Sequence, residues 1–125
     1  MAKASNQVIW IEFPVKNMAR AKKFYYRVFG QKFTDMDMPG MKMAMFPWHE
    51  GAPFASGALV KAENYVPNAT GAVVYFSCED VADELSRAES NGGKVIVPKT
   101  SIGESGYFAH ILDTEGNRVG LHSMH

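Results

Sequence analysis

Three histidines, His110, His122 and His125, lie close together near the C-terminal end of the chain, in the segment AHILDTEGNRVGLHSMH. Histidine is a common metal ligand and also the side chain whose charge changes near neutral pH. Two apolar stretches separated by the acidic turn 113–116 predict a β-hairpin, which would place His110 and His122 about 5–8 Å apart on one sheet face and His125 at a frayed end. Because a metal needs at least a third ligand, a hydrogen-bonded or acid–base pair is favoured over a metal site. His122 is a candidate catalytic base, and His110 is a candidate ligand-binding residue.

The run VIWIEF predicts a β-strand on which Trp10 and Glu12 share one face. If this face lines a cavity, Glu12 is suited to act as a general base or to anchor a cationic or hydrogen-bonding ligand. The alternative is a carboxylate at the end of a strand, paired with a lysine or arginine at the rim. Glu12 is therefore a candidate catalytic residue, and Trp10 is a candidate ligand-binding residue.

Five methionines between residues 36 and 45 lead into Phe46-Pro47-Trp48-His49. Such a run suits an adaptable apolar pocket wall, but core packing or a subunit interface is the favoured interpretation because apolar strands usually pack. Phe46 and Trp48 are candidate ligand-binding residues, and Trp48 lies on a predicted loop that would close over the cavity.

The elements that position these residues follow the same order twice. Asn17 and Asp80 are N-cap residues before apolar stretches with helical spacing, and glycines end both stretches. The first copy predicts a strand at 7–14, a helix at 18–29 and strands at 31–36, 41–46 and 55–60. After a polar connector at 63–70, the second copy predicts a strand at 72–77, a helix between 80 and 91, and strands at 94–97, 107–112 and 118–122, with a flexible loop at 99–106.

A shift of about 63 residues aligns caps, helix faces and following strands, for example Asn17 with Asp80, so the chain is a duplicated βαβββ unit. Neither half alone buries both faces of a four-stranded sheet. We therefore predict an α+β fold in a single domain, residues 1–125. Its tandem modules, at about 7–62 and 71–124, form curved mixed sheets around a cup, with the helices outside. Tyr75 is equivalent to Glu12 in the repeat, which makes its hydroxyl a candidate ligand-binding group.

The 125 residues are 46% hydrophobic and carry 13 basic and 13 acidic side chains. A balanced charge does not attract phosphate backbones or anionic lipids, so nucleic acid and membrane surfaces are poor partners. The N-terminal segment lacks the pattern of a secretory leader, and no run approaches the ~20 apolar residues of a membrane span, so a cytoplasmic protein is expected. The single cysteine, Cys78, excludes an internal disulfide and has no partner placed to make it a nucleophile.

The chain resembles the vicinal oxygen chelate superfamily, which includes glyoxalase I, bleomycin-resistance proteins and extradiol dioxygenases. The segments that carry the resemblance are IEFPVKNMARAKKFYYRVFG, VYFSCEDVADELSRAESNGGKVIVPKT and FAHILDTEGNRVGLHSM. It covers about residues 8–124, is closest to small single-domain glyoxalase-related proteins and is not specific to any reaction. It implies the duplicated fold, a cleft for a small molecule and a homodimer.

The resemblance also implies metal-ligand positions on the first and fourth strands of each module, normally occupied by His or Glu. In this sequence they fall on Trp10, on Val73, on Gly120 and on the segment 55–60, which contains no His, Asp or Glu. None of these side chains binds a divalent cation. We therefore expect no metal or other cofactor. We do not transfer glyoxalase I or dioxygenase activity to this chain, because that chemistry needs a metal to polarise paired oxygens.

The sequence thus predicts a metal-free glyoxalase-like protein that binds a small apolar or aromatic molecule in its cup. The candidate binding residues are Trp10, Phe46, Trp48, Tyr75 and His110. One alternative is a lyase or isomerase that uses Glu12 or His122 as base, or a metal enzyme whose ligands have moved to Glu12, His110 and His122. The other alternative is a non-catalytic dimeric interaction module whose cup is filled by its own side chains.

Overall fold

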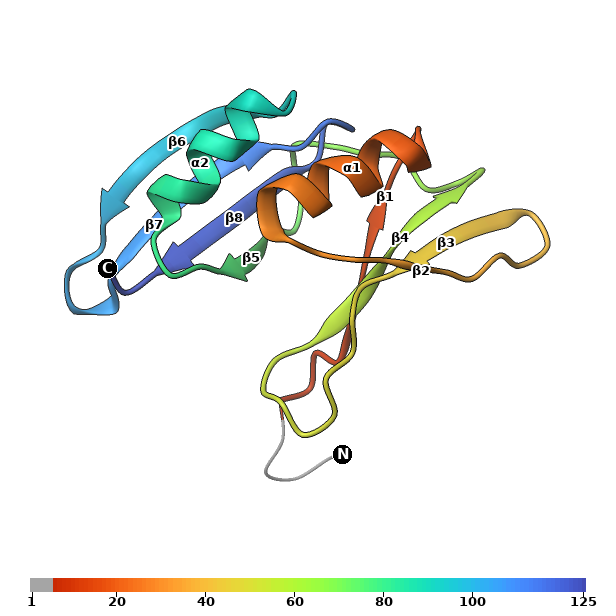
Figure 1. Cartoon of the computed structure of the whole chain (residues 1–125), viewed down its shortest axis with the longest axis horizontal. Coiled ribbons are helices and arrows are strands. Elements are labelled where there is room, and N and C mark those ends of the chain that lie inside the picture. Colours follow the sequence, from red (N-terminus) through yellow and green to blue (C-terminus); the bar gives the residue numbers. More distant parts are fainter. Residues whose placement is uncertain (1–5) are drawn as a thin grey trace.

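The computed structural model describes residues 6–125, which form two four-stranded mixed sheets and two α-helices (Figure 1). The first module contains β1 (Trp10–Pro14), α1 (Met18–Phe29), β2 (Thr34–Asp35), β3 (Met41–Met45) and β4 (Ser56–Ala62). The second contains β5 (Val74–Ser77), α2 (Val81–Ser90), β6 (Lys94–Ser101), the short 3-10 helix η1 (Gly103–Ser105), β7 (Tyr107–Leu112) and β8 (Arg118–Ser123). The predicted α+β fold with two βαβββ modules is confirmed.

Both sheets have the same topology. The strand orders are β1-β4-β3-β2 and β5-β8-β7-β6. In each sheet the first strand of the module pairs in parallel with the last strand, and the other pairs are antiparallel. No helix among residues 6–125 is long and apolar enough to cross a membrane.

Local sequence signals explain where both helices begin and where α1 ends. The Asn17 side chain accepts a hydrogen bond from the Arg20 backbone N–H (3.0 Å), and the Asp80 side chain accepts one from the Ala82 N–H (2.9 Å). Gly30 has a φ of 68°, which costs glycine little, and its N–H bonds to carbonyls of the last turn of α1. The predicted helix 18–29 is confirmed.

The flexible loop predicted at 99–106 is wrong in part. The structure continues β6 through Ser101, opposite Tyr107, and then forms η1. Register shifts between Val95 and Val97 and between Val97 and Thr100 absorb Pro98, which has no N–H to donate to a ladder. The bulged strand was missed because the proline and the following polar residues are typical of a loop.

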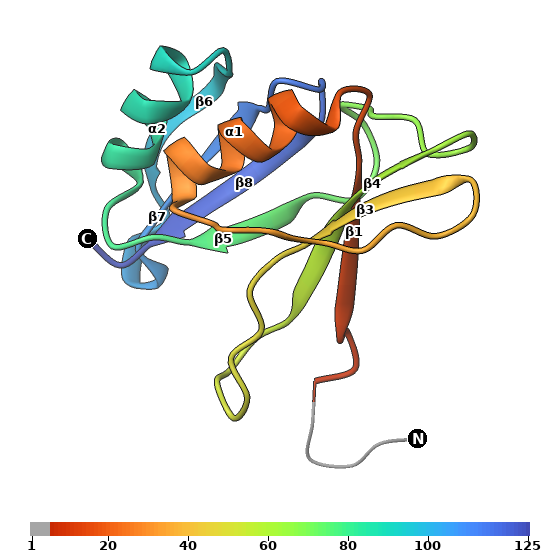
Figure 2. The same ribbon diagram turned by 45° about the vertical axis from the view of Figure 1, so that its right-hand side comes forward.

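The helices lie beside one another on the outer side of the sheets (Figure 2). Arg87 of α2 donates from Nε to the carbonyl of Val28 in α1 (3.0 Å). Beneath them, one apolar core contains residues of both modules, and Phe13 of β1 lies 5.9 Å from Phe76 of β5 between ring centroids. Burial of aromatic rings is a large part of what stabilises such a core, so the two modules are joined by apolar packing.

A polar junction also joins the modules, at the turn between β7 and β8. Glu115 accepts hydrogen bonds from the backbone N–H groups of Lys16 and Asn17, both at 2.8 Å, where α1 begins. In the same turn, Asp113 accepts a hydrogen bond from the buried Tyr25 hydroxyl of α1 (2.6 Å). The second module therefore satisfies backbone and side-chain donors of the first.

The sheets diverge from this junction and do not close on each other (Figures 1 and 2). Trp10 of the first sheet is 40% exposed and Tyr75 of the second is 50% exposed, and both point away from the helices. The cup expected from the sequence is therefore open within one chain, and each sheet has its own uncovered face.

Candidate functional site

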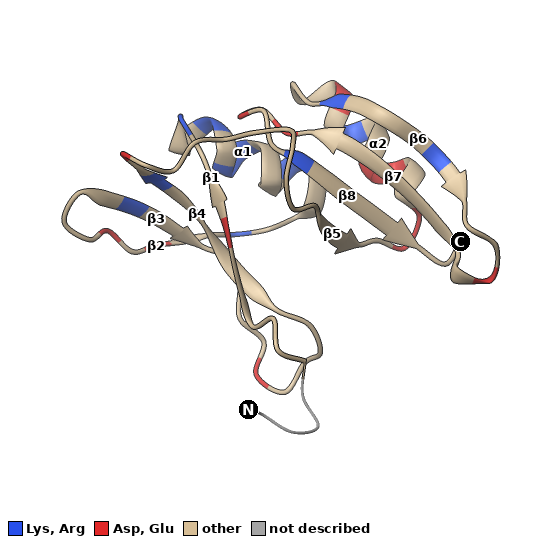
Figure 3. Cartoon of the chain, turned by 180° about the vertical axis from the view of Figure 1, so that it is seen from behind, with Lys and Arg blue, Asp and Glu red and all other residues tan. Residues whose placement is uncertain are grey.

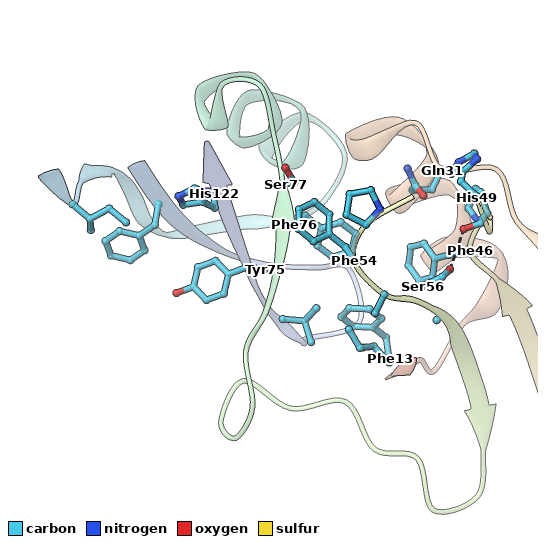
Figure 4. Close-up of a pocket in the computed structure, with 18 residues that line it drawn as sticks. Phe13, Gln31, Phe46, His49, Phe54, Ser56, Tyr75, Phe76, Ser77 and His122 are labelled. Carbon is cyan, nitrogen blue, oxygen red and sulfur yellow. Dashed lines mark hydrogen bonds between the residues drawn. The ribbon is translucent and has the colours of Figure 1, made fainter. Parts of the chain in front are cut away.

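A cleft of about 1070 Å³ lies between the two modules (Figure 4). One wall comes from β1, the start of β4 and the segment 46–57, and the other comes from β5, β7 and β8. Its aromatic lining residues are Phe13, Phe46, Phe54, Tyr75, Phe76 and Phe108. Its lining side chains with a polar group are Gln31, His49, Ser56, Tyr75, Ser77 and His122.

The lining residues in the described part of the chain include no Asp, Glu, Lys or Arg. Figure 3 shows that the charged residues are spread over both modules, with acidic and basic side chains interspersed. Phe46 lies 5.9 Å from Phe13 and 6.1 Å from Phe76 between ring centroids, so the rings of the two modules hold one another in place. The arrangement is an aromatic cleft with a few hydrogen-bonding groups and, among its described lining residues, no carboxylate, lysine or arginine side chain.

The structure distributes the predicted site residues over the cleft, a smaller hollow and the open faces of the two sheets. Phe46, Tyr75 and His122 line the cleft. Trp48 is 64% exposed and lines a smaller hollow of about 380 Å³, next to Phe54. Trp10, Glu12 and His110 lie on the open faces of the sheets, and the cleft lining does not include them. The structure therefore does not bring the predicted set into a single cavity.

Glu12 and Trp10 form a small polar cluster with a residue that sequence reasoning missed. The indole N–H of Trp10 donates to Oε2 of Glu12 (3.2 Å), and the hydroxyl of Tyr65 donates to Oε1 (2.7 Å). This bond raises the pKa of Tyr65. As predicted, Trp10 and Glu12 share a face, but the hydrogen bonds of the Glu12 carboxylate come from two neutral groups, Trp10 of the same strand and Tyr65 of the connector. Nothing in the polar connector around Tyr65 indicated this contact, because 53 residues separate it from Glu12.

The open face of the second sheet carries a second hydrogen-bonded group. The Nε2 atom of His110 lies 2.6 Å from the Tyr75 hydroxyl, and its Nδ1 atom lies 2.9 Å from Nη1 of Arg118. Arg118 is itself held by a hydrogen bond from Nε to the carbonyl of Ala69 (3.1 Å). Partial burial and the nearby guanidinium lower the pKa of His110, so the imidazole is neutral near pH 7. Sequence reasoning missed Arg118, although its place at the start of the last strand, beside the predicted histidine pair, was visible.

His122 is fixed by a contact to the loop that follows β6. Its Nε2 lies 2.6 Å from the carbonyl oxygen of Ser105 in η1. A carbonyl only accepts hydrogen bonds, so Nε2 carries the proton and, in the neutral ring, Nδ1 is the acceptor. As predicted, His110 and His122 lie on the same sheet face, because Ala109 and Leu121 between them pack into the core on the other side.

The residues at the expected metal positions do not fit a metal ion. The Tyr75 ring lies across Gly120, where an added Cβ would come within 2.6 Å of the ring. Trp10 and Val73 offer no ligand atom, and the β4 side chains on the face of Glu12 include Ala58 and Val60. Among residues 6–125 there is no group of three or more His, Cys, Asp or Glu side chains arranged to hold a metal ion. Glu12 lies on the first sheet, away from the two histidines of the second.

The fold and the cleft define the class of protein to which the chain belongs. The sequence profile of the Glyoxalase/Bleomycin resistance protein/Dioxygenase superfamily matches residues 7–121, and the chain is a member of this superfamily. A glyoxylase-like domain-containing protein of Didymella fabae is 32% identical over 115 residues, which are 89% of this chain and 88% of that protein. CFP32 of Mycobacterium tuberculosis is 28% identical over 116 residues; these are 90% of this chain but 43% of CFP32, so the chain spans less than half of that relative.

Solved structures of the superfamily share this fold. A glyoxylase/bleomycin resistance protein/dioxygenase domain from Frankia sp. EAN1pec has a TM-score of 0.74 at 14% identity and covers 96% of this chain and 98% of its own. TnmS3, an antibiotic binding protein from Streptomyces sp. CB03234, has a TM-score of 0.67 at 22% identity and covers 98% of both chains. Glyoxalase I from Zea mays has a TM-score of 0.68 at 18% identity, and the match covers 94% of this chain and 46% of that one. These matches show the fold, and the activity has to be argued from the site.

Proposed function

We propose that this chain binds an uncharged, largely aromatic small molecule in the cleft between its modules, without a metal. The observation that carries the proposal is the composition of the cleft: about 1070 Å³ of space bounded by aromatic rings and a few neutral polar groups. Ligand pockets of this size are typically apolar, with a small number of polar groups that fix orientation. The cytoplasmic location expected from the sequence stays a prediction.

The same composition argues against an anionic ligand. Carboxylates enter a cleft at a high desolvation cost unless they are paired with a cation. The described lining residues include no Lys or Arg. Metal-assisted chemistry is also not proposed, since the side chains at the expected ligand positions, such as Trp10 and Gly120, supply no donor atoms.

The second candidate function is a lyase or isomerase reaction with His122 as the base. Its support is the Nδ1 lone pair, which the contact to Ser105 leaves available in a residue of the cleft. Glu12 is the weaker base candidate, because its carboxylate already accepts two hydrogen bonds on the open face of the first sheet. Exchange of the methyl protons of 2-acetylnaphthalene for deuterium by the wild type, but not by the His122→Gln variant, would favour this candidate over simple binding.

We also propose that the chain forms a homodimer through exposed apolar side chains of its first module. Several large apolar side chains near β1 and the segment 46–57 are well exposed: Val8, Ile9, Trp10, Trp48 and Phe54. Contiguous exposed apolar residues of this kind commonly mark interaction surfaces. Sedimentation of the wild type as a dimer and of the Phe54→Asp variant as a monomer would support the proposal, and a monomeric wild type at 100 µM would contradict it.

The binding proposal is tested with 2-ethylnaphthalene, a neutral aromatic probe, by fluorescence titration and thermal shift. Ser77 is exposed on β5 and lines the cleft, so Ser77→Trp should fill the site and abolish binding. Ser86, exposed on α2 and absent from the cleft lining, gives the matched control Ser86→Trp, which should bind like the wild type. Equal binding by both variants would reject the cleft as the site. A stoichiometric metal found in the purified protein would reject the metal-free proposal.

A further inference from the structure

One face of the second sheet holds three side chains joined in a chain of hydrogen bonds: Arg118, His110 and Tyr75 (2.9 Å and 2.6 Å). Their order determines where each proton lies. A guanidinium has only donors, so Nδ1 of His110 must be the acceptor of the Arg118 contact. In a neutral imidazole the other nitrogen, Nε2, then carries the hydrogen.

This tautomer fixes the role of the tyrosine. Because Nε2 of His110 donates, the Tyr75 oxygen accepts, and the single hydroxyl proton of Tyr75 is left to point elsewhere. Tyr75 is half exposed and is one of the residues that line the cleft. Figure 4 shows its ring and hydroxyl on the same side of the cleft as His122. The free hydroxyl proton is therefore at the edge of the space in which we propose that the ligand binds.

We propose that Arg118 and His110 orient Tyr75 as a hydrogen-bond donor to a carbonyl or quinone oxygen of an aromatic ligand. This inference rests on the proposed function and narrows the ligand to planar aromatic molecules that carry such an oxygen. Tyr75 contacts the ligand, and Arg118 and His110 are positioning residues that act through it. A relay that begins at a cation polarises the hydroxyl and strengthens its donation.

Two neighbouring residues support this assignment. Gly120 leaves the space that the Tyr75 ring occupies, since any Cβ there would meet three ring atoms at 2.6–2.7 Å. Phe108 lines the cleft and packs edge-on against His110, with ring centroids 5.5 Å apart, which holds the imidazole in its plane. The sheet is thus built to keep the tyrosine ring and the imidazole in one arrangement.

The first test determines the tautomer in the ligand-free protein by long-range ¹H–¹⁵N correlation spectra of the histidine rings at pH 7.5. The expected result is a His110 ring with a protonated Nε2 and an unprotonated Nδ1. Arg118→Met should convert it to a mixture of tautomers, since the donor to Nδ1 is gone. A protonated Nδ1 in the wild type would overturn the inference.

The second test compares two probes of nearly equal shape, 2-acetylnaphthalene and 2-ethylnaphthalene, of which only the first has a carbonyl. Tyr75→Phe keeps the ring over Gly120 and removes the donor. It should weaken acetylnaphthalene binding about five-fold to ten-fold, the effect of one neutral hydrogen bond, and change ethylnaphthalene binding less than two-fold. Arg118→Met should also weaken acetylnaphthalene binding, by a smaller factor, and leave ethylnaphthalene binding nearly unchanged. A general structural defect would weaken the binding of both probes.

Tyr26→Phe is the control, since it removes the hydroxyl of a tyrosine that is 52% exposed and does not line the cleft, and it should leave both affinities unchanged. Equal effects of Tyr75→Phe on both probes would overturn the inference while leaving the proposed function intact. Failure of the wild type to bind either probe would overturn the proposed function and the inference with it.

Discussion

The carboxylate of Glu115 lies 2.7 Å, from Oε2 to Nε, from the guanidinium of Arg20, although 95 residues separate them in the chain. Glu115 belongs to the turn between β7 and β8, and Arg20 belongs to the first turn of α1. The same carboxylate accepts hydrogen bonds from the backbone N–H groups of Lys16 and Asn17. An acidic group at a helix N-terminus also interacts favourably with the helix dipole. This junction joins the turn between β7 and β8 to the start of α1, and so joins the second module to the first.

Replacing Glu115 with glutamine should lower the free energy of unfolding by about 2–4 kcal/mol, because Arg20 loses its ionic partner and the amide NH2 group must face some of the donors that the carboxylate accepts. Urea denaturation followed by circular dichroism measures the change. The matched control is Glu104→Gln, on the exposed residue of η1, which should change stability by less than about 0.5 kcal/mol. Equal effects of the two substitutions would contradict the role of the junction.

Stability should fall in acid through the same residue. Burial alone would raise the pKa of Glu115, but hydrogen bonds from Arg20, Asn17, Lys16 and Thr114 outweigh it and lower the pKa from 4.5 to about 2. A carboxyl with a depressed folded-state pKa stabilises the protein fully above its unfolded-state pKa and loses this contribution as pH falls towards the folded-state value. Here the loss, about 3 kcal/mol, should occur between pH 5 and pH 2, as a rough window. In that range the stability difference between wild type and Glu115→Gln should shrink, and a constant difference would contradict the assignment.

Tyr25→Phe should destabilise the protein by about 1–3 kcal/mol, because it removes the buried 2.6 Å hydrogen bond to Asp113. Burial, followed by the nearby Asp113 carboxylate, raises the pKa of Tyr25 well above 10, so the hydroxyl stays protonated as a donor. Thermal unfolding of the variant measures the loss. Tyr26→Phe is the control, since Tyr26 is 52% exposed and its change should be small.

Two glycines in strands should respond differently to alanine. At Gly57 an added Cβ would lie 1.9 Å from the backbone oxygen of Ile11, so Gly57→Ala should prevent native pairing of β1 with β4. At Gly120 the obstacle is the side chain of Tyr75 and not the backbone, so Gly120→Ala should displace the ring from its hydrogen bond at a cost of about 1–3 kcal/mol. Adding Tyr75→Ala should restore stability to Gly120→Ala but not to Gly57→Ala. Chemical denaturation measures the stability of each variant. If Tyr75→Ala restored the stability of both glycine variants, or of neither, the contacts assigned to the added Cβ atoms would be wrong.

The thiol of Cys78 should be nearly unreactive in the folded protein. Burial, followed by the nearby Glu84 carboxylate, raises its pKa to about 12. At pH 8 the thiolate fraction is then about a thousand-fold smaller than in an unfolded chain, and alkylation by iodoacetamide should slow by a similar factor. Comparing the labelling rate in buffer with that in guanidinium chloride measures this ratio. A native rate within ten-fold of the unfolded rate would contradict it.

Much of the architecture followed from local signals. The caps at Asn17 and Asp80, the glycine that ends α1 and the period-two alternation in β1, β7 and β8 act over a few residues, so the repeat and its faces could be predicted. The ends of the strands could be predicted less well. β6 was predicted too short because Pro98 interrupts the strand pattern of the sequence, whereas in the structure the register shifts on either side of Val97 let the strand continue past this proline. Phe46, Tyr75 and His122 were predicted as site residues and line the cleft, since each follows from alternation or from its place on a loop next to a strand.

Thus the sequence alone determined the two modules, their strand faces and the superfamily resemblance, because these depend on neighbours in the chain. The tertiary structure decided which side chains meet. Tyr65 lies beside Glu12, Arg118 beside His110, and Glu115 at the start of α1, and no periodicity encodes such long-range contacts. It also decided that the sheets diverge, which separates Glu12 from the histidines. Apolar packing and the junction at Glu115 join the two modules, and the cleft between them is lined by aromatic rings that come from segments far apart in the chain.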